Sequence, residues 1–132
     1  MCSANKRLVK NEQKYWPFIR KLRNDKRVKE GFVSQQHISE EDHEDFMKDH
    51  GDKYYICLVG DVPAGFVGSI MGDIRVATDP CYQGKGVGKF MISEILLKFP
   101  DSYAKVKTEN KASLALFESC GFKKKYFILE RE

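Results

Sequence analysis

The feature that most constrains this chain is a run of alternating glycines in the segment Gln83-Gly84-Lys85-Gly86-Val87-Gly88-Lys89. The β-rich stretch Ile74–Thr78 precedes it and a helical apolar stripe from Phe90 to Leu96 follows it, so we expect it to join a strand to a helix. Glycine accepts positive φ and lets other groups approach the backbone, and the first N–H groups of a helix have no partner within the helix. The helix N-terminus also favours negative charge. Together, the unpaired N–H groups and this favourable field predict a binding site for a phosphate or diphosphate, a cradle of backbone amides.

Spacing excludes two common phosphate motifs. A P-loop needs glycine at position 83 and Ser or Thr at position 90, where this chain has Gln83 and Phe90. A dinucleotide fingerprint needs glycine at position 89, which is Lys89, and it lies near the start of its domain. A tight strand-to-helix turn without a ligand remains the alternative.

Periodicity along the rest of the chain predicts a mixed sheet flanked by helices, an α/β (α+β) fold. The predicted strands are Lys6–Lys10, Tyr54–Val59, Ala64–Ile70, Ile74–Thr78, Tyr103–Lys107 and Phe122–Leu129. The predicted helices are Tyr15–Asn24, a segment from a Ser39 N-cap to Gly51, the segment after the glycine run, and Lys111–Ser119.

Composition bounds the class of protein. A length of 132 residues, of which 42% are hydrophobic, predicts one domain over residues 1–132 with a real core. No apolar run approaches the roughly 20 residues of a bilayer span, and the N-terminus lacks the apolar stretch of a signal peptide. We therefore expect a soluble, cytoplasmic protein with no membrane partner. The cysteines at 2, 57, 81 and 120 form no C-x-x-C pair, so neither a disulfide framework nor a metal site is expected.

The net charge of +4 is unevenly spread, since residues 6–29 are rich in Lys and Arg and residues 40–52 are acidic. The basic stretch is either a solvated surface or an attraction for an anionic substrate or coenzyme. The acidic neighbour argues against a broad nucleic-acid-binding face.

Two signatures in order resemble the GNAT superfamily of N-acetyltransferases. Gln83-x-x-Gly86-x-Gly88 is similar to its acetyl-CoA motif, and the segment from Asn110 to Gly121-Phe122 is similar to its second motif. With the strand before the glycines, the resemblance covers residues 74–122. It implies a central, mostly antiparallel, splayed and twisted sheet of about six to seven strands flanked by helices, with acetyl-CoA as co-substrate and no metal.

The resemblance also implies roles for single residues. Backbone groups of Val76 and Thr78 would pair with the pantetheine arm, and Asn110 and Ser113 would lie beside it. The pyrophosphate would meet Gln83, Gly84, Lys85, Gly86, Val87, Gly88 and Lys89. Phe117 would lie beside the thioester. A helix cap at Asn110 and a core position for Phe117 are the alternatives.

Acyl transfer to an amine requires a neutral amine and a stabilised oxyanion. A backbone N–H at Val76 or Ala77 is the candidate donor, and such donors contribute about 2.7–4 kcal/mol. Asp73 is the candidate base, with a turn-forming role as its alternative, and His37 and His43 are the other candidates.

Many members carry a Tyr at the position of Phe117, which protonates the departing sulfur. That role is therefore open here to Tyr82, Tyr126 or water.

The acceptor side has a narrower resemblance. Arg23-Asn24-Asp25, followed by Ile38-Ser39-Glu40-Glu41-Asp42-His43, is similar to sugar-nucleotide N-acetyltransferases such as those of pseudaminic acid biosynthesis, and also to ribosomal-protein N-terminal acetyltransferases. It implies that Arg23, Asn24 and Asp25 line the acceptor site, unless they merely end a helix.

We therefore expect an N-acetyltransferase acting on a primary amine, for example of an amino sugar or sugar nucleotide. The alternatives are a protein or peptide N-terminal acetyltransferase and an inactive acyl-CoA-binding module. The expected partner is a small-molecule amine and not a nucleic acid, and the expected state is a monomer or homodimer.

Overall fold

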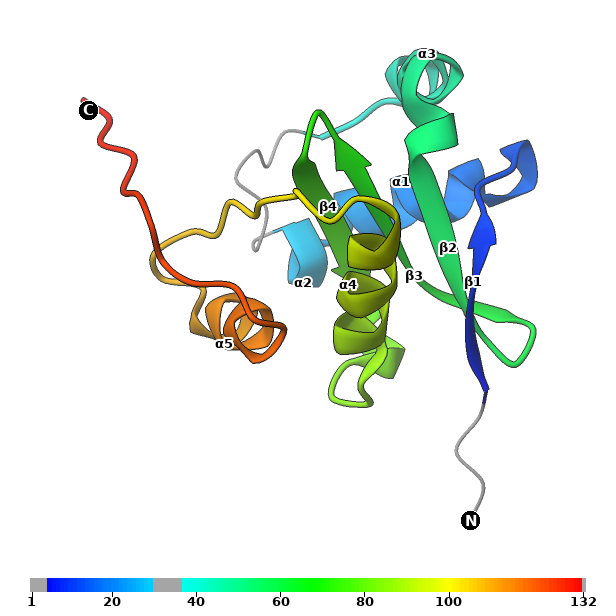
Figure 1. The fold of residues 1–132 in the computed structure, drawn as a ribbon. Helices are drawn as coiled ribbons and strands as arrows, with labels where there is room; N and C mark the ends of the chain where they lie inside the picture. The colour runs from blue at the N-terminus through cyan, green and yellow to red at the C-terminus, as the bar shows by residue number, and fades with distance from the viewer. Residues whose placement is uncertain (1–4, 30–36, 132) are drawn as a thin grey trace.

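A four-stranded antiparallel sheet forms the centre of the molecule, in the computed structural model that describes residues 5–29 and 37–131 (Figure 1). Its strands lie in chain order: β1 (Lys6–Lys10), β2 (Tyr54–Val59), β3 (Val62–Ile70) and β4 (Asp73–Thr78). The helices are α1 (Trp16–Asn24), α2 (Lys26–Lys29), α3 (Glu40–His50), α4 (Val87–Lys98) and α5 (Lys111–Ser119), with 3-10 turns at Gln13–Tyr15, Gly51–Lys53 and Pro80–Tyr82.

Tight turns fix the register of the central strands. β3 and β4 are joined by Met71 and Gly72, with φ of 52° and 86°, the positive values of a type I′ hairpin turn. Ile70 therefore pairs with Asp73, and the ladder continues to Gly65 opposite Thr78. Residue alternation then places Asp73 and Arg75 on one face of β4 and Ile74 and Val76 on the other.

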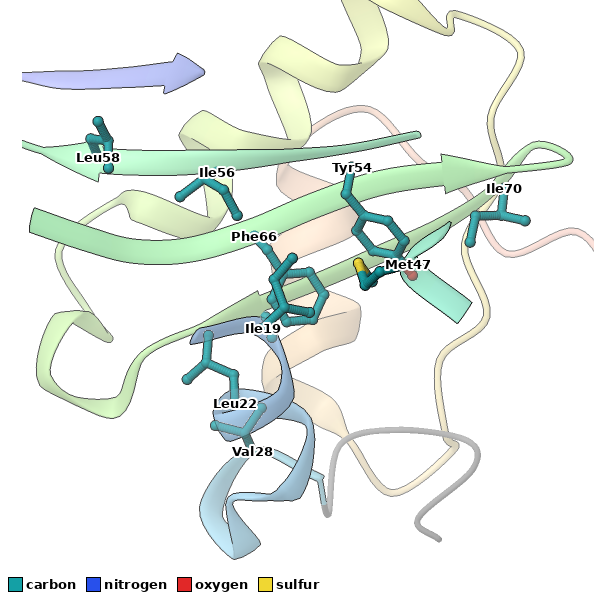
Figure 2. Packing of buried hydrophobic residues seen from close by; sticks show 10 residues of the cluster. Ile19, Leu22, Val28, Met47, Tyr54, Ile56, Leu58, Phe66 and Ile70 are labelled. Atoms are coloured by element: carbon teal, nitrogen blue, oxygen red, sulfur yellow. The ribbon is translucent and has the colours of Figure 1, made fainter. Parts of the chain in front are cut away.

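The two faces of the sheet carry separate cores. On one face, Ile19 and Leu22 of α1 and Met47 of α3 pack against Ile56 and Phe66 (Figure 2). On the other face, apolar side chains of α4 and α5 cover the sheet: Met91, Ile92, Ile95 and Phe117 pack against Cys57, Val67 and Ile74. The sheet is thus the middle layer between two helical layers, which leaves only its edges open.

The N-terminus of α3 confirms the predicted cap. The Ser39 side chain accepts a hydrogen bond of 3.1 Å from the Asp42 amide, and three acidic residues occupy the first turn. Carboxylates at this end of a helix are stabilised by its dipole. The acidic block is therefore explained locally as the start of a helix.

Two predicted strands do not form, so the sheet has four strands and not six to seven. Tyr103–Lys107 makes one parallel bridge, in which the Ile74 amide donates to the Tyr103 carbonyl at 2.9 Å and the Tyr103 amide to the Gly72 carbonyl at 2.7 Å. The chain then leaves β4. Phe122–Leu129 has no strand partner among the described residues, and its Leu129 side chain is 92% exposed. Both segments have strand-like sequences, but a strand exists only where a neighbour takes up its backbone hydrogen bonds.

Candidate active site

The free edge of β4 exposes unpaired backbone groups. In an antiparallel ladder, amides point alternately towards the partner strand and away from it. The Ile74 amide points away from β3 and donates to the Tyr103 carbonyl. The amides of Val76 and Thr78, two and four residues further on, therefore also point away from β3. Among the described residues nothing pairs with them. Ala77, opposite Phe66, directs its amide to β3.

The glycine turn follows β4 after the 3-10 turn at Pro80–Tyr82 and leads into α4. Gly84 and Gly86 have φ of 77° and 80°, and Gly86 is the N-cap of α4 without a side-chain cap bond. Within the described part of the chain, the amides from Gly84 to Lys89 donate no hydrogen bond. A Cβ added at Gly84 would meet nothing within 4 Å, and one at Gly86 only Lys6 Cε at 4.0 Å. The cradle is therefore open, and its donors fit a diphosphate.

Lysines surround the cradle. Lys85 and Lys89 are exposed on it, and Lys85 Nζ lies 5.6 Å from the centre of the Tyr82 ring. Lys6 was not singled out as a site residue from the sequence, because only the packing of α4 against β1 brings it near Gly86. No sequence signal marks it.

The third glycine has a packing role. A Cβ at Gly88 would lie 3.0 Å from Leu116 Cδ2, so this position lets α4 and α5 approach each other. The adjacent Val87 is almost fully buried and anchors the start of α4. The turn is thus held from its inner side while its outer side stays open.

The residues of the second signature are seen in structural roles. Asn110 Oδ1 caps α5 by accepting from the Ser113 amide at 3.1 Å. Its Nδ2 has no acceptor among the described residues and remains available to a ligand. Phe117 is 5% exposed and packs edge-on to Phe122 with ring centres 5.2 Å apart. The cap and core alternatives are therefore both observed, and the coenzyme contacts stay predictions.

Asp73 is the carboxylate beside the open edge. It is 9% exposed, and its Oδ2 lies 3.2 Å from Arg75 Nε and 3.9 Å from Lys105 Nζ. It opens β4 directly after the hairpin turn, so the turn position and the charged contacts are both present. The candidate base is therefore a mostly buried carboxylate that two cations contact.

The candidate histidines lie elsewhere. His43 of α3 is buried, and its Nε2 lies 2.9 Å from the Trp16 carbonyl, which can only accept. Nε2 therefore carries the hydrogen and Nδ1 is bare, with no partner among the described residues. Burial lowers the pKa of His43 despite that hydrogen bond, and the charges of Arg23 and Arg20 add to the lowering. His37 is exposed before α3.

A cavity of about 660 Å³ lies between α1 and α3, lined by Trp16, Arg20, Asn24, Asp25 and His43 among others. None of its lining residues belongs to β4 or to the glycine turn. The cavity is therefore separate from the open edge of β4 and from the glycine turn.

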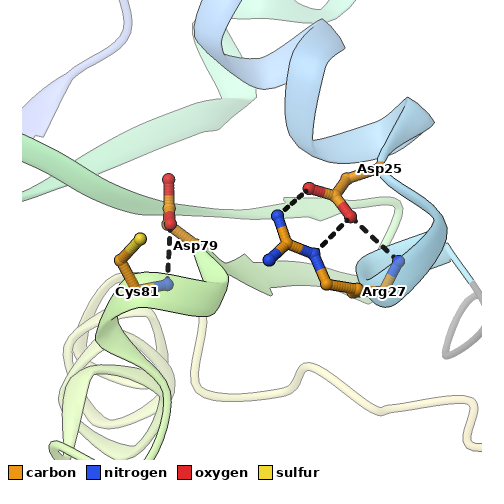
Figure 3. Close-up of polar contacts among 4 residues, drawn as sticks. All are labelled: Asp25, Arg27, Asp79 and Cys81. Atoms are coloured by element: carbon orange, nitrogen blue, oxygen red, sulfur yellow. Dashed lines mark hydrogen bonds and ion pairs between the residues drawn. The ribbon is translucent and has the colours of Figure 1, made fainter.

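Two of the three predicted acceptor residues are engaged within the protein. Asn24 holds the Ile38 backbone through two hydrogen bonds, each of 2.9 Å. Asp25 accepts from the Arg27 amide at 2.9 Å and pairs with its guanidinium at 3.0 Å, next to Asp79 and Cys81 (Figure 3). This corner between α1 and α2 lies beside the end of β4.

Arg23 is the third predicted acceptor residue, and its environment differs from those of Asn24 and Asp25. Its guanidinium lies over the Phe46 ring, 5.0 Å from the ring centre, and has no carboxylate partner within the described part of the chain. Burial lowers the pKa of Arg23, and Arg75 lowers it further, against an opposing effect of Tyr54.

Comparison with known proteins decides the family. The model of the acetyltransferase (GNAT) family matches residues 16–122. This chain belongs to the GNAT acetyltransferase family. The N-alpha-acetyltransferase RimI of Mycobacterium tuberculosis is 42% identical over 52 residues, which are 37% of this chain and 32% of that protein. The aligned stretches span 14% and 32% of the lengths of two curated relatives.

Solved GNAT-like structures share the fold. A spermidine N-acetyltransferase from Vibrio cholerae, in complex with CoA and spermine, has a TM-score of 0.82 at 19% identity, over 96% of this chain and 85% of its own. The aminoglycoside acetyltransferase AAC(6')-Ib in complex with coenzyme A has a TM-score of 0.74 at 14% identity, over 92% and 86%. At these identities the likeness establishes the arrangement of the elements only.

The cysteines of the described residues, Cys57, Cys81 and Cys120, are free thiols. Burial raises the pKa of the Cys57 thiol to about 11, whereas Cys81 is exposed. Cys2 lies outside the described residues. Within residues 5–29 and 37–131, no three His, Cys, Asp or Glu side chains gather as a metal site, and no helix has the length and apolarity to cross a membrane.

Proposed function

We propose that this GNAT family member transfers an acetyl group from acetyl-CoA to a primary amine. The observation that carries the proposal is the continuity of two sets of free backbone groups. The unpaired edge at Val76 and Thr78 is joined to the open amide cradle at Gly84–Lys89 by the short 3-10 turn at Pro80–Tyr82. A ligand with an extended amide arm and a diphosphate matches both sets at once, whereas a simple phosphate would use only the cradle.

The coenzyme is held mainly by backbone. Amides of the Gly84–Lys89 turn bind the diphosphate at the N-terminus of α4, with Lys6, Lys85 and Lys89 neutralising its charge. Val76 and Thr78 pair with the pantetheine amides as a neighbouring strand would, and Asn110 Nδ2 donates to the same arm.

The chemistry of the reacting end follows from the same strand. Acetyl-CoA supplies an acetyl thioester whose carbonyl carbon an amine can attack. As the C–N bond forms, the C–S bond breaks, and coenzyme A leaves as a thiolate that takes up a proton from water or a nearby tyrosine. The Val76 amide donates to the carbonyl oxygen, a contact that strengthens as negative charge develops there. Ala77, the other predicted donor, directs its amide to β3 and is not used. An alkylammonium has an ordinary pKa near 10.4, so at neutral pH it must lose a proton before its nitrogen can attack. Asp73 accepts that proton.

The acceptor is a small primary amine, such as that of an amino sugar or a sugar nucleotide. The narrow sequence similarity around Arg23–Asp25 and Ile38–His43 supports this class. The second candidate is the N-terminal amine of a protein, which the similarity to RimI favours.

Two experiments test the proposal. Acetyl-CoA at 100 times its dissociation constant should stabilise the protein by about 2.7 kcal/mol in a thermal melt. Thiol release should then be followed over a panel of amino sugars, sugar nucleotides and peptides. Absence of any thermal shift would refute coenzyme binding. A thermal shift without turnover on the whole panel would instead identify a coenzyme-binding module that has lost catalysis.

A further inference from the structure

An unusual group of charges lies on the face of β4 that α1 covers. Arg75 and Asp73 share this face by strand alternation, and α1, which carries Arg23, packs against β4. Lys105 reaches the same carboxylate from the segment that leaves the sheet after Tyr103. The group lies next to Val76, whose amide we assign to the reacting carbonyl.

The charges of this group do not balance. Arg23, Arg75 and Lys105 contribute three positive charges, and Asp73 contributes one negative charge, which leaves an excess of two. No other carboxylate in the described ranges forms an ion pair with any of the three cations. Lys107, further along the same segment, pairs with Glu109 at 3.5 Å and is not counted.

Arg23 is the member of the group that is hardest to explain as a surface charge. Its guanidinium is partly buried over the Phe46 ring, and burial lowers its pKa, as does the charge of Arg75, against an opposing effect of Tyr54. A partly buried cation without a counter-ion costs free energy, and an anionic ligand would remove that cost. Guanidinium groups match carboxylates and phosphates in geometry. Arg23 is one of the predicted acceptor residues, and Arg75 lies beside the candidate base Asp73.

We infer that the acceptor is an anionic amine, whose carboxylate or phosphate is bound by Arg23 and Arg75 while its amino group lies beside Asp73. This inference rests on the proposed function, because it specifies the acceptor of that same site. A polyamine or an aminoglycoside is a poor acceptor here, since a polycation would meet an excess of two positive charges. The fold is shared with enzymes for such polycations, but the charges on this face are not those that would attract them.

The test uses acceptors in matched pairs, at saturating acetyl-CoA, with thiol release as the readout. The phosphate arm compares glucosamine 6-phosphate with glucosamine, and the carboxylate arm compares a dipeptide with its C-terminal amide. Spermidine is the polycation. We expect at least one anionic member to exceed its neutral partner by about tenfold or more in kcat/KM, and to lose that advantage at high salt. The arm with the larger ratio identifies the anion.

Variants assign the effect to residues. Arg23→Gln and Arg75→Gln should raise KM for the anionic acceptor by about tenfold while changing KM for its neutral partner little. Arg23→Lys should restore part of the affinity. Lys21→Gln, on the exposed side of α1, is the matched control and should behave as the wild type. Equal rates for the two members of both pairs, or preference for spermidine, would overturn the inference without touching the proposed function.

A protein that binds acetyl-CoA but turns over none of these amines is still informative. Inorganic phosphate should then stabilise the coenzyme-saturated protein in a thermal melt, and Arg23→Gln but not Lys21→Gln should abolish that stabilisation. Absence of stabilisation by phosphate, and by acetate as the carboxylate probe, would refute the anion site. Absence of acetyl-CoA binding itself would refute the proposed function instead.

Discussion

The substitution Gly86→Asp separates coenzyme binding from folding. Gly86 has φ of 80° and an open outer side, where an added Cβ meets only Lys6 Cε at 4.0 Å. The conformational cost of a non-glycine residue there is about 1 kcal/mol, which lowers Tm by about 4 °C for a domain of this size. A carboxylate within about 5 Å of a phosphate charge opposes it by about 1–3 kcal/mol, so the new side chain would repel a diphosphate held in the cradle. Binding should therefore weaken by about 100-fold or more.

A thermal melt with and without acetyl-CoA measures both effects. At 100 times the wild-type dissociation constant, the wild type should gain about 2.7 kcal/mol, or about 10 °C, and the variant only about 0.4 kcal/mol, or 1–2 °C. Gly60→Asp is the matched control, because Gly60 has φ of 62° and open surroundings in the β2–β3 hairpin. It should lose similar stability and keep the full acetyl-CoA shift. If Gly86→Asp also kept that shift, the cradle would not be the diphosphate site.

Three further predictions concern catalysis and stability. Asp73→Asn should lower kcat by about 10²–10⁴-fold and remove the acidic limb of the pH–rate profile, and an unchanged profile would exclude Asp73 as the base. Ser39→Ala removes the cap on the Asp42 amide and should lower Tm by about 4 °C without changing acetyl-CoA affinity; a loss of affinity would link α3 to the site. Because the pKa of Cys57 is raised from 9.0 to about 11 in the folded state, its contribution to stability, up to about 2–3 kcal/mol, is present below pH 9 and lost between pH 9 and 11. Cys57→Ala should flatten the fall of Tm in that range, and an equally steep fall in the variant would refute this origin.

Local sequence signals predicted most elements correctly. Ser39 caps α3 and the glycine run leads into α4, as the cap side chain and the φ preference of glycine predict. These features depend on interactions within a few residues. The apolar stripe from Phe90 to Leu96 likewise predicted α4, the helix that covers one face of the sheet.

Long-range pairing was predicted less well. The segment Tyr103–Lys107 has a strand-like sequence, but it meets β4 at one bridge only, and Phe122–Leu129 meets no strand in the described chain. Alternating side chains show that a segment can be extended, and they carry no information about whether another backbone lies within hydrogen-bonding distance. The number of strands was therefore overestimated.

The sequence alone predicted the glycine turn as a cradle of free amides, because these donors belong to one continuous segment whose geometry glycine itself permits. Only the tertiary structure decided which charges gather on the face of β4 that α1 covers. Asn24 and Asp25 proved to be engaged within the protein, whereas Arg23 has no carboxylate partner in the described chain and lies near Arg75. Residues from α1, β4 and the segment after Tyr103 form that group, and their proximity depends on how the helices pack on the sheet and not on their spacing along the chain.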